Sequence, residues 1–304
     1  MIHKLIVFWV MLTAVTSFAA ATEKTQAPEK LSATEIAERN VTARGGLQKW
    51  RSVQTLTMTG KMEAGGNNRS TLPMPGRKDS RFVPPPRPAE QVRLPFVMEL
   101  KRPRKMRVEM QFNGQTAIQV FDGTNGWKLR PFLNRKEIEP YTEEEMKTVA
   151  TQAELDGPLI DYAAKGTTIS LIGAEKVEGH DTYRLRLTMK SGKTTDLWID
   201  ATTYLEAKIE GTPRRLDGKY RSVEVYYRDY RTVGGLQIPF VLETRVLSPQ
   251  TTRLALPTTA SEQILLEKVE VNPQLNDAVF SRADLETAAS GKSTATMAPQ
   301  KAAR

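Results

Sequence analysis

Short segments in which apolar and polar residues alternate, separated by tight-turn dipeptides, recur along most of this chain of 304 residues. Leu56, Met58 and Met62 show the pattern in the first such segment. A period of two residues indicates a strand with one buried face, and dipeptides such as Ser191-Gly192 and Gly234-Gly235 favour sharp reversals. About eleven or twelve short antiparallel strands are therefore expected. This number of strands is too large for a small sandwich and indicates a strongly curved sheet or an incomplete barrel.

Two helices are expected among the strands. A capping box at Ser32 predicts a helix over 33–44, and the sequence T-E-E-E at Thr142 predicts a second helix that runs towards Leu155. The turn sequence Asp156-Gly157-Pro158 then interrupts this second helix. The expected fold class is mainly β with a few helices.

The first residues have the form of a secretory signal peptide. M-I-H-K is followed by an apolar run and then by small residues, which offer cleavage after Ala19 or Ala21. The apolar run is shorter than the roughly 18 to 20 residues that a membrane span needs. Residues 1–21 are therefore expected to be removed on export, and residues 22–31 to form a polar tether.

A single domain is expected over 32–282. Within it, residues 64–92 are rich in proline and arginine and cannot pair in a sheet, so they are interpreted as a loop inserted into the first hairpin. Residues 283–304 are rich in alanine, serine, threonine and lysine, and are expected to form a disordered tail.

Scarce cysteine and histidine argue against most catalytic and metal chemistry. The chain has no cysteine and two histidines, of which His3 leaves with the signal and His180 lies in a turn sequence. The chain therefore lacks the residues needed for disulfides, for thiolate nucleophiles, and for most Ser-His-Asp triads and zinc sites. Carboxylates such as Asp122, Asp196 and Asp200 could pair, but each lies in a turn or at a strand end, where aspartate is common. We therefore expect no enzyme activity, no catalytic residues, no cofactor and no metal.

The net charge of +9 is concentrated in places, and five of the seven residues from Lys101 to Arg107 are basic. Such a run is typical of a nucleic-acid patch, of a surface that meets anionic head groups, or of a solvated surface. Export and the lack of an aromatic platform motif argue against nucleic acid. Lys101 to Lys105 are expected at a rim that meets head groups or a lid.

Methionine suggests a use for the apolar faces. Its side chain is flexible and polarisable, so it lines surfaces that adapt to a variable apolar guest, although it also fills gaps in ordinary cores. We expect the sheet to curve around an apolar cavity. The expected lining residues are Leu56, Met58, Met62, Phe96, Met98, Met106, Val108, Met110, Phe112, Ile118, Val120, Trp127, Leu185, Leu187 and Met189.

The order of elements and several motifs carry a family resemblance. The motifs are L-K-R-P at the start of a strand, V-F-D-G-T-N-G-W in the next hairpin, A-R-G-G-L-Q-K-W, W-I-D, G-G-L-Q-I-P, and a late V-N-P-x-L-x-x-x-x-F. Over about Ser32 to Phe280 the chain resembles the periplasmic outer-membrane lipoprotein-sorting superfamily, LolA/LolB-like, with RseB-like sensors as cousins.

This resemblance implies a half-open antiparallel β-barrel of about eleven strands, with helices as a lid over a cavity for lipoprotein acyl chains. It also implies that Arg102 latches the lid through hydrogen bonds to backbone carbonyls, since a guanidinium offers five donors. Leu159, Ile160 and Tyr162 are the expected lid residues.

The resemblance predicts a monomeric carrier in the Gram-negative periplasm that binds lipoprotein acyl chains or another lipid and does not bind nucleic acid. Contacts with an anionic membrane surface or with envelope proteins are further expected partners. The inserted loop, with Met106 and Val108 where carriers commonly have aromatic residues, leaves a phospholipid or a glycolipid as an alternative ligand. The alternative function is an envelope-stress sensor or protein-interaction module on the same fold.

Overall fold

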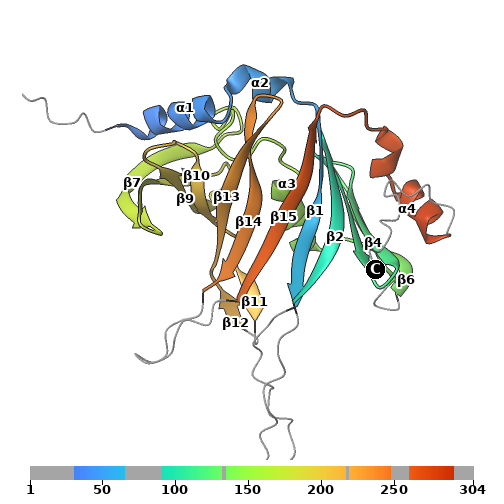
Figure 1. Ribbon diagram of the computed structural model, residues 1–304. Helices are drawn as coiled ribbons and strands as arrows, with labels where there is room; N and C mark the ends of the chain where they lie inside the picture. The colour runs from blue at the N-terminus through green and yellow to red at the C-terminus, as the bar shows by residue number, and fades with distance from the viewer. Residues whose placement is uncertain (1–30, 66–90, 132–134, 217–218, 248–259, 291–304) are drawn as a thin grey trace, which may run out of the picture. The chain divides into compact units, whose positions relative to one another are not determined.

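The computed structural model describes residues 31–65, 91–131, 135–216, 219–247 and 260–290 (Figure 1). The expected signal peptide, almost all of the tether, most of the proline- and arginine-rich insertion and the end of the tail lie outside the described residues.

Helices begin at both expected capping boxes. The hydroxyls of Ser32 and Thr142 each accept a hydrogen bond from the backbone amide of the third helical residue. That residue is a glutamate in both helices, and its carboxylate accepts a hydrogen bond from the backbone amide of the capping residue. In the described part of the chain the helical elements are α1 (Ala33–Ala43), α2 (Leu47–Ser52), α3 (Glu143–Gln152), the 3-10 helix η2 (Asp277–Phe280) and α4 (Arg282–Ala289).

Strands make up most of the rest. They are β1 (Thr55–Gly65), β2 (Gln91–Lys101), β3 (Lys105–Phe112), β4 (Gln115–Phe121), β5 (Gly126–Arg130), β6 (Arg135–Pro140), β7 (Thr168–Val177), β8 (His180–Thr188), β9 (Thr194–Asp200), β10 (Glu206–Glu210), β11 (Arg214–Leu216), β12 (Lys219–Arg221), β13 (Val223–Val233), β14 (Leu236–Val246) and β15 (Ala260–Val271).

Thirteen strands form one open antiparallel sheet in the order β6-β5-β4-β3-β2-β1-β15-β14-β13-β10-β9-β8-β7, and β11 and β12 form a separate pair. The mainly β class is as expected, whereas the strand number differs from about eleven. The strand that the sequence pattern missed in the main sheet is β6, because R-K-E-I-E-P has only one large apolar residue and no alternation.

The connection from β6 to β7 must cross the sheet, because these strands are its two opposite edges. This crossing segment, residues 141–167, contains α3 and packs Val149 and Ala153 against the buried side chains of Leu56 and Phe96. We call the sheet face that it covers the inner face, and the opposite one the outer face.

A second layer covers part of the outer face. Phe280 of η2 and Leu285 of α4 pack into one buried cluster with Ile118, Val120 and Leu129 of β4 and β5, and Figure 1 shows α4 beside these strands. The expectation of disorder from residue 283 was therefore wrong as far as Ala289. One apolar residue per helical turn is a weak signal in sequence, but burial of that side chain stabilises so short a helix.

The turn between α1 and α2 lies directly on the β13–β14 turn. The amide of Gln237 donates to the Arg44 carbonyl at 3.1 Å. Gly45 has a φ of +111°, and a Cβ at this position would lie 2.4 Å from the carbonyl oxygen of Gly235. Glycine is needed here because any side chain would push the two turns apart.

Candidate apolar binding site

A row of half-buried apolar side chains runs across the inner face. Strand register defines it, because residues directly opposite each other on antiparallel strands share a face. Ile209 lies opposite Val225, Leu242 opposite Ile264, and Ile264 opposite Met62. The inner-face row comprises Met58, Met62, Met98, Met110, Phe112, Ile209, Val225, Leu242 and Ile264. Their partial exposure distinguishes this surface from a filled core.

Elsewhere on the inner face, near α2 and α3, buried side chains of the protein fill the space. Met106 and Phe96 are 1% and 2% exposed, and they share a cluster with Trp50, Val53 and Val149. Apolar surface on the inner face is therefore divided between a closed core and the more open inner-face row.

The structure brings most of the expected lining residues to one face. Leu56, Met58 and Met62 of β1 share that face with the expected residues of β2 and β3, and Leu185 and Leu187 lie on the same face at β8. Met189 lies in the β8–β9 turn, where its carbonyl accepts from Gly192.

Three expected lining residues lie on the outer face instead. Ile118, Val120 and Trp127 belong to the cluster under η2 and α4, so they cannot line the inner face. Both faces of β4 are covered, and the sequence A-I-Q-V-F offers an apolar residue to each. The pattern alone therefore could not decide which set points inwards.

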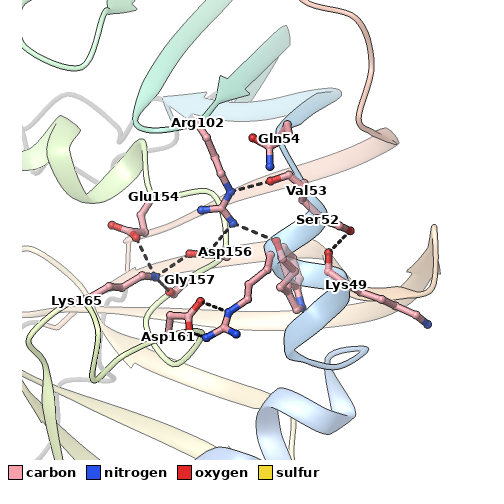
Figure 2. A network of polar contacts seen from close by, with 12 residues as sticks. Lys49, Ser52, Val53, Gln54, Arg102, Glu154, Asp156, Gly157, Asp161 and Lys165 are labelled. Carbon is pink, nitrogen blue, oxygen red and sulfur yellow. Dashed lines mark hydrogen bonds and ion pairs between the residues drawn. The ribbon is translucent and has the colours of Figure 1, made fainter.

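Arg102 joins three segments (Figure 2). Its Nε donates to the carbonyl of Val53 at 2.7 Å, and its Nη2 donates to the carbonyl of Trp50 at 3.1 Å and to Oδ2 of Asp156 at 2.7 Å. Trp50 and Val53 lie at the C-terminal end of α2, and Asp156 belongs to the crossing segment. The three residues expected to form a lid follow in that same segment, where Leu159 and Ile160 are buried and Tyr162 is half-buried.

Further ion pairs hold the crossing segment beside Arg102. Lys165 binds Oδ1 of Asp156 at 2.7 Å and Glu154 at 2.8 Å, while Arg51 of α2 forms two hydrogen bonds with Asp161. The hydrogen bond from Arg51 lowers the pKa of Asp161. Sequence reasoning missed Asp156, because Asp-Gly-Pro is equally typical of an ordinary turn.

The basic run of the β2–β3 turn is neutralised within the protein. Lys101 and Lys105 both bind Oδ1 of Asp277 in η2, at 2.9 and 3.2 Å, and Arg104 binds Glu154 at 3.3 Å. Arg107 lies on the outer face and binds both Glu109 and Asp284. The expected free rim for head groups is therefore taken up by η2, α4 and the crossing segment.

A pocket of about 320 Å³ lies between α3 and β4. Its lining residues are Gln119, Tyr141, Thr142, Glu144, Glu145, Thr148, Val149 and Gln152. The Tyr141 ring fits here because residue 126 is glycine, since a Cβ there would lie 2.1 Å from a ring carbon.

Buried charge lies directly beside this pocket. Nζ of Lys128, a residue only 5% exposed, lies 2.5 and 2.6 Å from the two carboxylate oxygens of Glu145. Burial by itself raises the pKa of Glu145, but the hydrogen bonds from Lys128 and Thr142 outweigh it and lower that pKa. Burial raises the pKa of Tyr141, so its hydroxyl stays protonated.

Neither a metal-ligand cluster nor a membrane-spanning helix occurs within the described ranges. No group of three or more histidine, cysteine, aspartate or glutamate side chains there has the arrangement of a metal site. Among the helices of the same ranges, none combines the length and the apolar character that crossing a membrane requires.

Comparison with known proteins gives the fold. No family model and no curated protein matches the chain. A LolA superfamily protein from Nitrosomonas europaea matches with a TM-score of 0.52 at 11% identity, over 83% of this chain and 99% of that one. A DUF1329 family protein from Desulfovibrio piger matches with a TM-score of 0.50 at 14% identity, over 83% and 98%. The described domain therefore has the fold of the LolA superfamily, the resemblance that its order of elements and its L-K-R-P motif predicted.

Proposed function

We propose that this protein is an exported, non-enzymatic carrier that holds the acyl chains of a lipoprotein or another lipid on its inner face. The observation that carries this proposal is the inner-face row, in which methionine, phenylalanine and branched side chains of several strands stay partly exposed on one face. Each methylene that leaves water contributes about 0.8 kcal/mol, so a chain of about fifteen would gain roughly 12 kcal/mol before ordering costs.

The crossing segment would act as the lid and Arg102 as its latch. Entry of an acyl chain beneath α3 requires Val149 and Ile160 to leave the positions they hold in the core. Arg102 opposes this movement because it bonds both to the end of α2 and to Asp156. A hydrogen bond to a charged group is worth about 1.5 to 3 kcal/mol, which a ligand of this size can replace.

The proposed setting is the periplasm, after removal of the signal peptide, with the protein acting as a monomer. Partners would be a donor and an acceptor of lipid at the two membranes. The compensated basic run disfavours direct binding of anionic head groups at Lys101 and Lys105 while η2 is in place.

The test is ligand binding by the inner-face row. Protein taken directly from periplasm should carry a lipid detectable by native mass spectrometry, and delipidated protein should bind an apolar fluorescent probe. Met98→Glu should weaken probe binding at least tenfold, because it places a carboxylate in the row. The matched control is Ile172→Glu, which adds the same charge at an exposed position of β7 and should leave binding unchanged. A delipidated protein that binds no acyl compound would overturn the proposal.

A further inference from the structure

The inner-face row is apolar, so the polar end of a lipid would have to lie elsewhere, and the pocket beside α3 is a candidate for it. We propose that this pocket binds a neutral, hydroxyl-bearing head group, such as a sugar or another polyol, whose acyl chains occupy the inner-face row. The inference rests on the proposed carrier function and adds the chemical class of the head group.

The pocket connects to the inner-face row through strand register. Gln119, on the pocket wall, lies opposite Val108 of β3, which lies opposite Met98 of β2. Met98 in turn lies opposite Met58 of β1. Neighbouring strands are about 4.8 Å apart, so three steps carry a chain roughly 14 Å from the pocket across the methionines. Val149 lines the pocket and also belongs to the buried cluster against which Met58 and Met98 pack, so this cluster borders both regions.

Hydrogen-bonding groups in the pocket suit a ligand with many hydroxyls. The Tyr141 hydroxyl lies 3.4 Å from Oε1 of Gln119, which leaves the amide nitrogen of Gln119 available. The Thr148 hydroxyl donates to the carbonyl of Glu144 and can still accept. Gln152 is exposed on the rim and presents a second amide. Amides and hydroxyls both donate and accept, which is what a hydroxyl group requires of its site.

Charge in the pocket argues against an anionic head group. The neighbouring cation, Lys128, is bound to both carboxylate oxygens of Glu145. Glu144 is exposed at the pocket and forms no ion pair with any other residue that the structure describes. Among the described residues, the pocket lining includes the carboxylates of Glu144 and Glu145 and no lysine or arginine. A phosphate bound there would therefore be repelled by like charge. A neutral head group avoids this cost.

The experiment compares ligands that share one chain and differ in head group. Binding of decyl glucoside, decyl phosphate and decyltrimethylammonium to the delipidated full-length protein would be measured by displacement of an apolar probe, below the micelle concentration of each. We expect decyl glucoside to bind at least fivefold more tightly than either charged compound. A preference for the phosphate or the ammonium compound would overturn the assignment of a neutral head group.

Variants then locate the preference. Gln119→Leu should weaken decyl glucoside binding about fivefold to tenfold, the loss of a hydrogen bond worth about 1 to 1.4 kcal/mol, and should change decyl phosphate binding less than twofold. Gln152→Ala, at an exposed position, should act in the same direction without a risk to folding. The matched control is Gln111→Leu, a glutamine of β3 that lies opposite Thr116 on the outer face.

The outcomes separate the two proposals. If none of the decyl compounds binds, the carrier function itself fails. If all bind equally and neither Gln119→Leu nor Gln152→Ala changes the ranking, the carrier function stands and the head-group pocket is refuted.

Discussion

Arg102 Nη2 lies 2.7 Å from Asp156 Oδ2, which ties the β2–β3 turn to the segment that crosses the inner face. The carboxylate side chain is 3% exposed and the guanidinium 29% exposed. The same guanidinium donates to the carbonyl of Trp50 in the last turn of α2 and to that of Val53, the residue that caps this helix. One side chain therefore connects the sheet, the second helix and the proposed lid, and this relationship gives the first prediction.

Arg102→Met should lower the free energy of unfolding by about 1.5 to 3 kcal/mol, the usual worth of hydrogen bonds to a charged group. The loss stays moderate because Lys165 still pairs with Asp156. Urea denaturation measures it. The matched control is Arg104→Met. Arg104 pairs with Glu154 and its side chain is 51% exposed, so its loss should cost less than about 1 kcal/mol. Equal losses in the two variants would show that the Arg102 contacts carry no special weight.

Truncation of two methionines on the same face should have different effects on stability and on ligand binding. Met106→Ala should destabilise the protein by about 2 to 5 kcal/mol, because Met106 is buried in the core. Met98→Ala should cost less than half as much, since Met98 is half-buried, but it should weaken binding of an apolar probe more than Met106→Ala does. Thermal unfolding and probe titration measure the two effects. Similar stability losses would mean that the inner-face row is as tightly packed as the core.

The C-terminal segment should be held mainly by one aromatic side chain. Phe280 is 1% exposed and packs on Ile118, Val120 and Leu129. Phe280→Ala should cost about 3 to 5 kcal/mol, the range for a buried phenylalanine, and should accelerate amide hydrogen exchange throughout α4. As a control, Glu286→Ala removes an exposed side chain of the same helix and should leave exchange in η2 unchanged. Unaltered exchange in the Phe280 variant would contradict this packing.

Stability should fall in acid partly through one carboxylate on the outer face. Hydrogen bonds from Arg228 are the main cause that lowers the pKa of Glu178 to about 2, and Arg245 adds to it. A folded pKa below the unfolded value means that this contribution is present above about pH 4.5 and is lost as pH falls towards 2. Because Glu178 is 36% exposed, salt should reduce the effect.

The Glu178→Gln variant checks this pH dependence. Its melting temperature should lie below that of the unsubstituted protein at pH 7, and the two curves should converge between pH 4.5 and about 2. Curves that stay parallel down to the lowest pH would show that the carboxylate of Glu178 does not contribute through its ionisation.

Much of the architecture follows from local patterns in the sequence. The period of two in each strand correctly placed Leu56, Met58 and Met62 on one face of β1, and the capping boxes at Ser32 and Thr142 correctly began two helices. These features depend on residues within a few positions of each other, so they can be recognised without knowledge of the tertiary structure.

Long-range packing decided the remaining features. Alternation shows which side chains of a strand share a face, but it does not show which face another segment will cover. The crossing segment covers the inner face because β6 and β7 are opposite edges of the sheet, whereas η2 and α4 cover the outer face of β4 and thereby take Ile118 and Val120 from the expected cavity.

Long-range packing also decides which charged residues pair with one another. The basic run at 101–107, the apolar alternation that begins within it and the order of elements of the LolA-like fold can all be recognised in the amino-acid sequence. The pairing of that run with Asp156, Asp277 and Asp284 cannot, because it depends on how the chain folds. These carboxylates lie from about 50 to 180 positions away along the chain, and a charge pair at such a separation exists only after the sheet has brought its partners together.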